Sequence, residues 1–148
     1  MAGIALDLIY GRGTPFFDAL YGDGIVTGAF SATYHAERDV AYLSIGGETP
    51  EPEELEDRLL ERLDQWLERS LPEAELARKK RKVLGRFLRN FESCESTAFV
   101  HSDAWTSGVD VFDYPALVES ISTHDVRKLA EAMFDEAARA TSLVLPRG

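Results

Sequence analysis

Apolar positions in the first quarter of the chain indicate two short helices. A run of apolar residues at 3–10 predicts the first helix, which Gly11 ends because glycine favours a chain break there. Thr14 followed by Pro15 predicts the start of the second, since a hydroxyl can cap the first free amides and proline fits the first helical position. This second helix is expected to stop near 22–24, a Gly-Asp-Gly sequence.

The spacing then changes to strict alternation, which is typical of strands. Apolar and polar residues alternate at 29–34, and a second β-rich stretch covers 40–45. A polar turn at 36–39 joins them, so an antiparallel hairpin is expected, and the two glycines at 46–47 end it. Residues 142–145, Ser-Leu-Val-Leu, predict a last short strand.

Between the hairpin and the last strand, the apolar positions follow a helical period. Leu55, Leu59, Leu63 and Trp66 form one stripe in a helix that begins with prolines and acids. Two capping boxes are expected, because Ser70 precedes Glu73 by three residues and Ser122 precedes Asp125 in the same way. The expected helices cover 51–68, 73–91, 94–106, 114–120 and 122–138. The second of them is expected to bury Leu76, Val83, Leu84, Phe87, Leu88 and Phe91.

This order of elements predicts one α+β domain over residues 1–148. Helices are expected to pack on one face of a small, mostly antiparallel sheet, because the strands do not alternate singly with helices as in a doubly wound fold. A hairpin with one more strand is a thin sheet, and its edge needs a partner. The sequence therefore indicates that another segment precedes residue 1 or docks against the sheet.

Composition and charge narrow the classes of partner. The 148 residues carry a formal net charge of −10, which repels nucleic-acid phosphates and anionic lipid, so neither nucleic acid nor membrane is an expected partner. Cys94 is the single cysteine and cannot form an internal disulfide. The N-terminal residues lack the pattern of a signal peptide, so a cytoplasmic chain or an internal piece of a longer one is expected.

Residues that could carry chemistry are sparse. His35, His101 and His124 are too far apart for a local zinc-binding pair, and the sequence contains no Gly-x-Ser-x-Gly elbow and no Walker motif. A zinc site assembled from the distant His35 and His101 with acids is a remaining alternative, which would make the chain a metal enzyme in its own right. The basic run at 78–82 is interpreted as the solvated face of a helix, packed antiparallel against the acidic helix before it.

Four stretches taken in order resemble one family. Residues 11–26, 44–50, 77–89 and 108–114 are similar to successive segments of bacterial zinc peptidases in the superfamily of insulinase, pitrilysin and the mitochondrial processing peptidase. The likeness covers nearly the whole chain and is greatest to the C-terminal, inactive-type lobe of the bacterial members.

The resemblance implies a metallopeptidase-like lobe without zinc. Members of the superfamily pair related α+β lobes as a clamshell around a peptide chamber, and one lobe carries a His-x-x-Glu-His motif with a further glutamate. This sequence has no such motif, and it begins at a helix that in the family follows an earlier strand and helix, so the front of the lobe is missing. Some zinc-free lobes hold substrate with an Arg and Tyr pair, which residues 41–54 do not supply.

The sequence therefore predicts a C-terminal fragment of a longer peptidase-like protein, inactive alone, that encloses substrate or assembles with a catalytic lobe. No cofactor is expected in this chain, and zinc is expected only in the partner lobe. The alternative is a stand-alone interaction module that pairs with a second copy of itself. Candidate peptide-contact residues are Ser31, Thr33, His35, Gly46 and Gly47.

Overall fold

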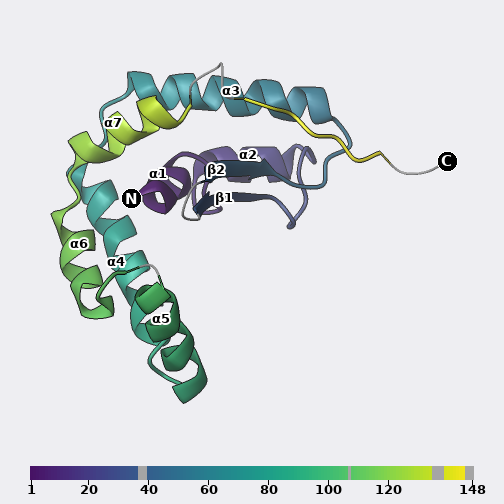
Figure 1. Cartoon of the computed structure of the whole chain (residues 1–148). Helices are drawn as coiled ribbons and strands as arrows, with labels where there is room; N and C mark the ends of the chain where they lie inside the picture. Colours follow the sequence, from purple (N-terminus) through teal and green to yellow (C-terminus); the bar gives the residue numbers. More distant parts are fainter. Residues whose placement is uncertain (37–39, 107, 135–138, 146–148) are drawn as a thin grey trace.

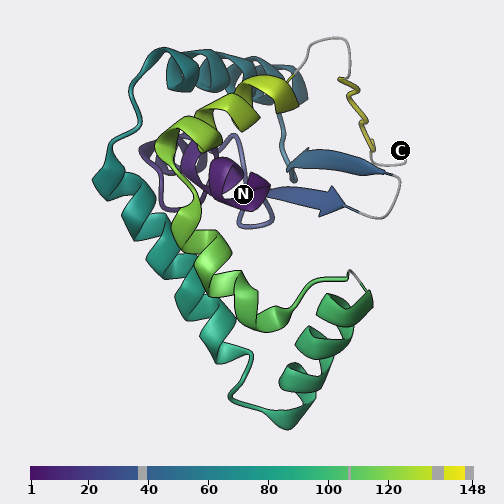
Figure 2. The same ribbon diagram turned by 60° about the vertical axis from the view of Figure 1, so that its left-hand side comes forward.

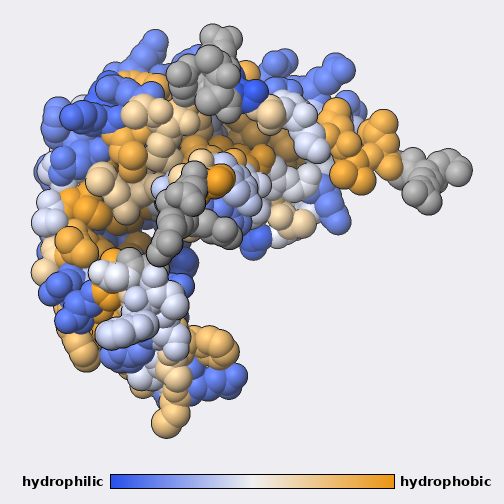
Figure 3. Space-filling model, viewed as in Figure 1, coloured by the Kyte–Doolittle hydropathy of each residue, from blue (hydrophilic) through white to orange (hydrophobic). Residues whose placement is uncertain are grey.

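The computed structural model describes residues 1–36, 40–106, 108–134 and 139–145, and it forms an arc of helices around one β-hairpin (Figures 1 and 3). The hairpin and the long helix α3 lie in one arm, and α4 and α5 lie in the other. In chain order the elements are α1 (Ala2–Ile9), α2 (Pro15–Gly22), β1 (Ser31–Ala36), β2 (Ala41–Gly46), α3 (Pro52–Glu68), α4 (Glu73–Arg89), α5 (Cys94–Thr106), a 3-10 turn (Val111–Asp113), α6 (Tyr114–Ser120) and α7 (Thr123–Met133).

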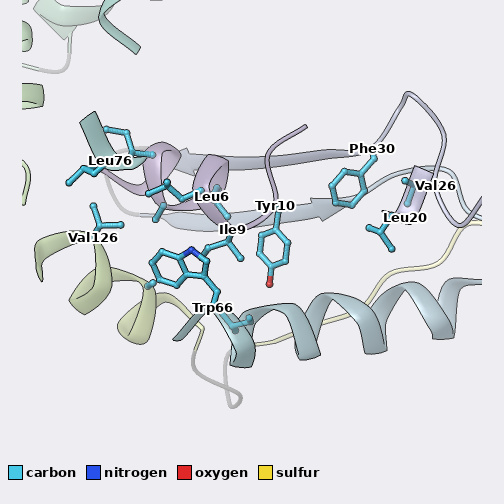
Figure 4. Packing of buried hydrophobic residues seen from close by; sticks show 14 of the residues in the cluster. Leu6, Ile9, Tyr10, Leu20, Val26, Phe30, Trp66, Leu76 and Val126 are labelled. Atoms are coloured by element: carbon cyan, nitrogen blue, oxygen red, sulfur yellow. The ribbon is translucent and has the colours of Figure 1, made fainter. Parts of the chain in front are cut away.

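Helix α1 is the centre of the core. Six of its eight residues are buried, which is typical of a helix enclosed on all sides. Trp66 of α3, Leu76 of α4 and Val126 of α7 belong to the same buried cluster as Leu6 and Ile9 of α1 (Figure 4). The core is therefore assembled around α1 by helices that begin more than forty residues after α1 ends.

The hairpin confirms the predicted alternation. Strands β1 and β2 pair antiparallel, with Ser31 opposite Gly46 and Tyr34 opposite Leu43. Ala32, Leu43 and Ile45 pack against the core, so helices cover one face of the sheet. The architecture is α+β, as the sequence predicts. Residues 37–39 of the predicted turn lie outside the described part of the chain.

Two predicted helix starts are confirmed. The Thr14 hydroxyl accepts a hydrogen bond from the Phe17 amide at the start of α2. Ser122 and Asp125 form the capping box of α7, each side chain accepting from the other residue's backbone amide. Because α7 begins in the predicted place, its Arg127 donates to the carbonyls of Leu67 and Arg69 at the end of α3. Helix α7 lies alongside α3 (Figure 2). The predicted end of this helix, 135–138, is not described.

The predicted third strand is wrong. Residues 142–145 form no strand in the structure, and the described sheet has two strands only. Backbone groups in a strand need a neighbour, and β1 and β2 bond to each other without reaching this segment. Leu143, Val144 and Leu145 are consequently exposed, with Val144 at 96%.

The capping box expected at Ser70 is also wrong. Pro72 is the N-cap of α4 and makes no side-chain cap bond. The Glu73 carboxylate accepts a hydrogen bond of 2.9 Å from the Thr123 hydroxyl at the start of α7, so its partner lies fifty residues further along the chain. A tertiary contact thus replaces the local one.

The basic run does not face the acidic helix, contrary to prediction. Helix α4 packs against α1 and α6, whereas α3 lies in the other arm of the arc (Figure 1). Lys79 is buried and binds Asp7 of α1, and Lys80 donates to the Glu119 carbonyl of α6. Leu88, expected on the buried side, is 64% exposed because the end of α4 extends beyond the core.

Within the described residues, no helix is both long enough and apolar enough to cross a bilayer.

Candidate functional site

The hairpin carries the candidate contact residues on its outer face. Ser31, Thr33 and His35 are exposed on β1, on the opposite side from the apolar residues that meet the core. The His35 ring stacks on Tyr42 of β2 with the ring centres 4.7 Å apart. The outer face is thus a polar surface with one aromatic pair.

The two glycines after this face have different surroundings. Gly46 stands opposite Ser31 at the end of the ladder. A Cβ added to Gly47 would lie 2.7 Å from the Phe30 Cα and 2.9 Å from its amide nitrogen. Gly47 therefore permits the backbone at 47 to lie close to the backbone of Phe30. Because Phe30 is buried, this contact packs the end of the hairpin against the core.

Replacing Gly47 with alanine is expected to lower the free energy of unfolding by about 1–3 kcal/mol, because backbone must move to admit the methyl group. The same change at Gly28 is the matched control, since a Cβ there meets nothing within 4 Å. It should alter stability by less than about 0.5 kcal/mol. Urea denaturation followed by circular dichroism measures both, and equal effects would contradict the packing role of Gly47.

The histidines do not come together as metal ligands. His35 lies on β1 against Tyr42, whereas His101 lies on α5 with its ring edge-on to Phe91 and Phe112. His124 is in α7. Across the described residues, no group of three or more His, Cys, Asp or Glu side chains is placed to hold a metal ion. The described residues therefore fit neither a His-x-x-Glu-His zinc site nor the alternative site built on His35 and His101.

Two hydrogen-bonded side chains with shifted pKa values stabilise the packing of helices. The Tyr10 hydroxyl donates to the Leu59 carbonyl at 2.9 Å, and burial raises the pKa of Tyr10 far above its usual range. Hydrogen bonds from the Ser122 side chain and backbone lower the pKa of the Asp125 carboxyl. Both interactions fix helices and neither lies on the outer face of the hairpin.

A groove of about 800 Å³ opens between the hairpin, α3 and α7. Hydrophobic residues gather in the hollow between these elements (Figure 3). Of the five candidate contact residues, Gly47 lines this groove, while Ser31, Thr33, His35 and Gly46 do not. Sequence reasoning missed the groove because its walls come from opposite ends of the chain; the one signal for it was the thin sheet with a free edge.

Comparison with known proteins shows which proteins this chain resembles. No family model matches the chain. A Bacillus subtilis (strain 168) protein named uncharacterized zinc protease YmfH is 30% identical over 129 residues, which cover 86% of this chain and 30% of the relative. This chain thus spans less than a third of the length of that relative.

Solved structures share the fold. A protein from Alicyclobacillus acidocaldarius assigned as an M16-like peptidase superposes with a TM-score of 0.79 and 23% identity, over 86% of this chain and 31% of its own. The inactive peptidase domain of a protein from Bordetella parapertussis assigned as a zinc protease gives a TM-score of 0.68 and 21% identity, over 98% of this chain and 84% of its own. Together with the zinc-protease relative, they place this chain in the M16 or insulinase-type superfamily of peptidases.

Proposed function

We propose that the chain is a non-catalytic lobe of an insulinase-type zinc peptidase, one that encloses substrate and assembles with a zinc-bearing lobe. The observation that carries the proposal is a peptidase-type fold in which the histidines stand on three separate elements. Water activation by zinc requires ligands converging on one point, and this arrangement offers none among the described residues. The likeness to an inactive peptidase domain over 98% of the chain supports the same role.

The outer face of the hairpin is the proposed contact surface for peptide. Ser31, Thr33 and His35 present hydroxyl and imidazole groups, so an unfolded peptide would be held by hydrogen bonds from these side chains to its backbone. Substrate choice would then follow the size of the chamber more than the sequence of the peptide. The partner is a catalytic lobe with a His-x-x-Glu-His motif, and the expected compartment is the cytoplasm.

The test combines this chain with a catalytic lobe encoded beside it that carries His-x-x-Glu-His. We expect cleavage of an unfolded fluorogenic peptide to require both chains, because each supplies one side of the chamber. A His101→Gln variant is the control and should support cleavage as well as the parent chain, since His101 holds no metal in this account. A catalytic lobe equally active alone would contradict the proposal.

A stand-alone interaction module is the second candidate, favoured by the exposed aromatic residues of the α5 arm. Phe99, Trp105 and Phe112 are 68%, 86% and 73% exposed, which is unusual for a free surface. This function predicts no zinc-motif partner encoded nearby, and a dimer in sedimentation. A monomer that activates a catalytic lobe would exclude it.

A further inference from the structure

Helices α3 and α4 carry charges of opposite sign on their exposed sides. In α3, a set of acids recurs every three or four residues, so its members share one side of the helix. All of them are exposed: Glu53, Asp57, Glu61, Asp64 and Glu68. In α4, the exposed cations have a similar spacing: Arg78, Arg81, Lys82, Arg86 and Arg89. We name these two sets the acidic stripe and the basic stripe.

The two stripes are not neutralised within the described part of the chain. No acid of the acidic stripe and no arginine of the basic stripe forms an ion pair with a described residue. Lys82 differs, since its ammonium lies 2.9 Å from the Asp7 carboxylate. The stripes of one chain also do not face each other, because α3 and α4 lie in different arms of the arc (Figure 1).

Each stripe destabilises its own helix. Like charges three or four residues apart in a helix repel one another, and both stripes are built from such pairs. Asp57 has an acid four residues away on either side, and Lys82 has an arginine four residues away on either side. A contact between an acidic stripe and a basic stripe would offset both repulsions at once.

We infer that the basic stripe of α4 binds the acidic stripe of α3 in a second copy of this chain. Charge complementarity favours this occupant, because the two helices are equally long, at 17 residues each, and present opposite charge over several turns. The formal net charge of −10 makes two copies repel at a distance. That repulsion is screened over about 8–10 Å at physiological salt, whereas the charges of stripes in contact lie closer together than this.

The contact joins two unlike surfaces. When the basic stripe of one copy is occupied, its acidic stripe is still available to a further copy. Such heterologous pairing continues beyond a dimer unless the rotation between copies closes a ring. The average mass is therefore expected to rise with protein concentration.

A nucleic acid is the other polyanion that a basic helix could bind. It is disfavoured because the acidic stripe would stay unneutralised, and because a chain of net charge −10 repels phosphates. The probe for it is a DNA duplex of random sequence in fluorescence anisotropy. A parent chain that binds this duplex but does not self-associate overturns the inference.

The test is sedimentation velocity of the parent chain over a range of protein concentrations. We expect self-association that weakens about tenfold or more between about 100 mM and about 500 mM sodium chloride, because salt screens attraction between exposed charges. A chain that stays monomeric in the lower salt at its highest soluble concentration overturns the inference. Association that salt leaves unchanged or strengthens also overturns it, because the contact would then be apolar.

Two variants with reversed charges test the pairing itself. The basic-stripe variant carries Arg78→Glu, Arg81→Glu and Arg86→Glu. The acidic-stripe variant carries Asp57→Lys, Asp64→Lys and Glu68→Lys. We expect each variant alone to associate more weakly than the parent chain by about tenfold or more, and an equimolar mixture of the two to recover the association. Loss in only one variant, or a mixture as weak as its components, overturns the pairing.

Net charge alone cannot produce this pattern, since one variant is more acidic than the parent chain and the other is less acidic. Glu53 and Arg89 are kept because a negative charge at the start of a helix and a positive charge at its end suit the helix dipole. Circular dichroism checks that both variants fold. If one does not, Arg81→Glu and Asp57→Lys replace the triple variants, and the same loss and recovery are expected with smaller amplitude.

The exposed aromatic residues of α5 supply the control surface. Trp105 belongs to neither stripe and is 86% exposed, so Trp105→Ala should leave association within about twofold of the parent chain. Equal weakening by Trp105→Ala and by the basic-stripe variant would place the contact on α5 and overturn the inference. None of these readouts involves peptidase activity, so the inference stands or fails independently of the proposed function.

Discussion

Replacing Trp66 with alanine is expected to lower the free energy of unfolding by about 3–5 kcal/mol, the usual cost of removing a large buried side chain. Trp66 is 2% exposed and lies where α3 meets α1 and α7, beside Ile9 (Figure 4). Among the described residues its indole nitrogen has no hydrogen-bond partner, so the loss is one of packing and leaves a cavity in the core. Since domains of this size are stable by only about 5–15 kcal/mol, the variant should be close to unfolded.

The second tryptophan supplies the control. Trp105 of α5 is 86% exposed, and its replacement by alanine should change stability by less than about 0.5 kcal/mol. Urea midpoints from far-ultraviolet circular dichroism compare the variants without relying on tryptophan emission. Similar midpoints for the two variants would contradict a core centred on α1.

Replacing Asp7 with asparagine is expected to cost about 3 kcal/mol or more, because it leaves a buried cation without its counter-charge. The Lys79 ammonium is 3.0 Å from the Asp7 carboxylate and 2.7 Å from the Asp7 carbonyl, and the Lys79 side chain is 6% exposed. Lys82, 2.9 Å from the same carboxylate, is 47% exposed. Lys82→Gln is therefore the matched control and should cost less than about 1 kcal/mol.

The same pair predicts a pH dependence. Burial raises the pKa of Asp7, but hydrogen bonds and charges from Lys82 and Lys79 outweigh it, and the pKa lies below its usual range. A carboxyl whose pKa is lower in the folded chain stabilises the fold above its unfolded pKa, near 4, and loses that contribution as pH falls through the folded value. Asp7→Asn should therefore flatten the loss of stability between about pH 4 and pH 2. An unchanged acid slope, measured by urea titration at each pH, would contradict the pair.

Local sequence signals predicted local structure well. Thr14 and Ser122 cap helices because each finds its partner within three residues, and alternation from 29 to 34 led to a hairpin whose two strands are neighbours in the chain. The apolar run of α1 also indicated a helix, though its place at the centre of the core depends on its packing against α3, α4, α7 and β1.

Non-local partners account for the errors. Glu73 binds Thr123, so the nearby Ser70 does not form the expected box. In the sequence Lys79 is one of five consecutive basic residues. In the structure it is buried, because it binds Asp7, which lies seventy-two residues earlier in the chain. Residues 142–145 have strand composition, but neither of the two described strands pairs with them. The groove beside β2 was missed for the same reason. Its walls come from distant parts of the chain, and no local sequence pattern predicts that they meet.

The candidate peptide-contact residues remain predictions. Ser31, Thr33 and His35 do share one exposed face, which alternation along a strand requires. Gly47 has a packing role against Phe30, and that role explains the glycine without any ligand. The family was predicted from the resemblance to zinc peptidases, whereas the arrangement of the histidines could be established only from the structure.

The central claim is that this chain does not activate water for peptide hydrolysis. The direct measurement is zinc content and peptide cleavage of the purified chain after incubation with zinc and removal of excess metal. We expect zinc well below one atom per chain and no cleavage above the buffer rate. One tightly held zinc per chain, with unaided cleavage that disappears in His35→Ala or His101→Ala, would contradict the account.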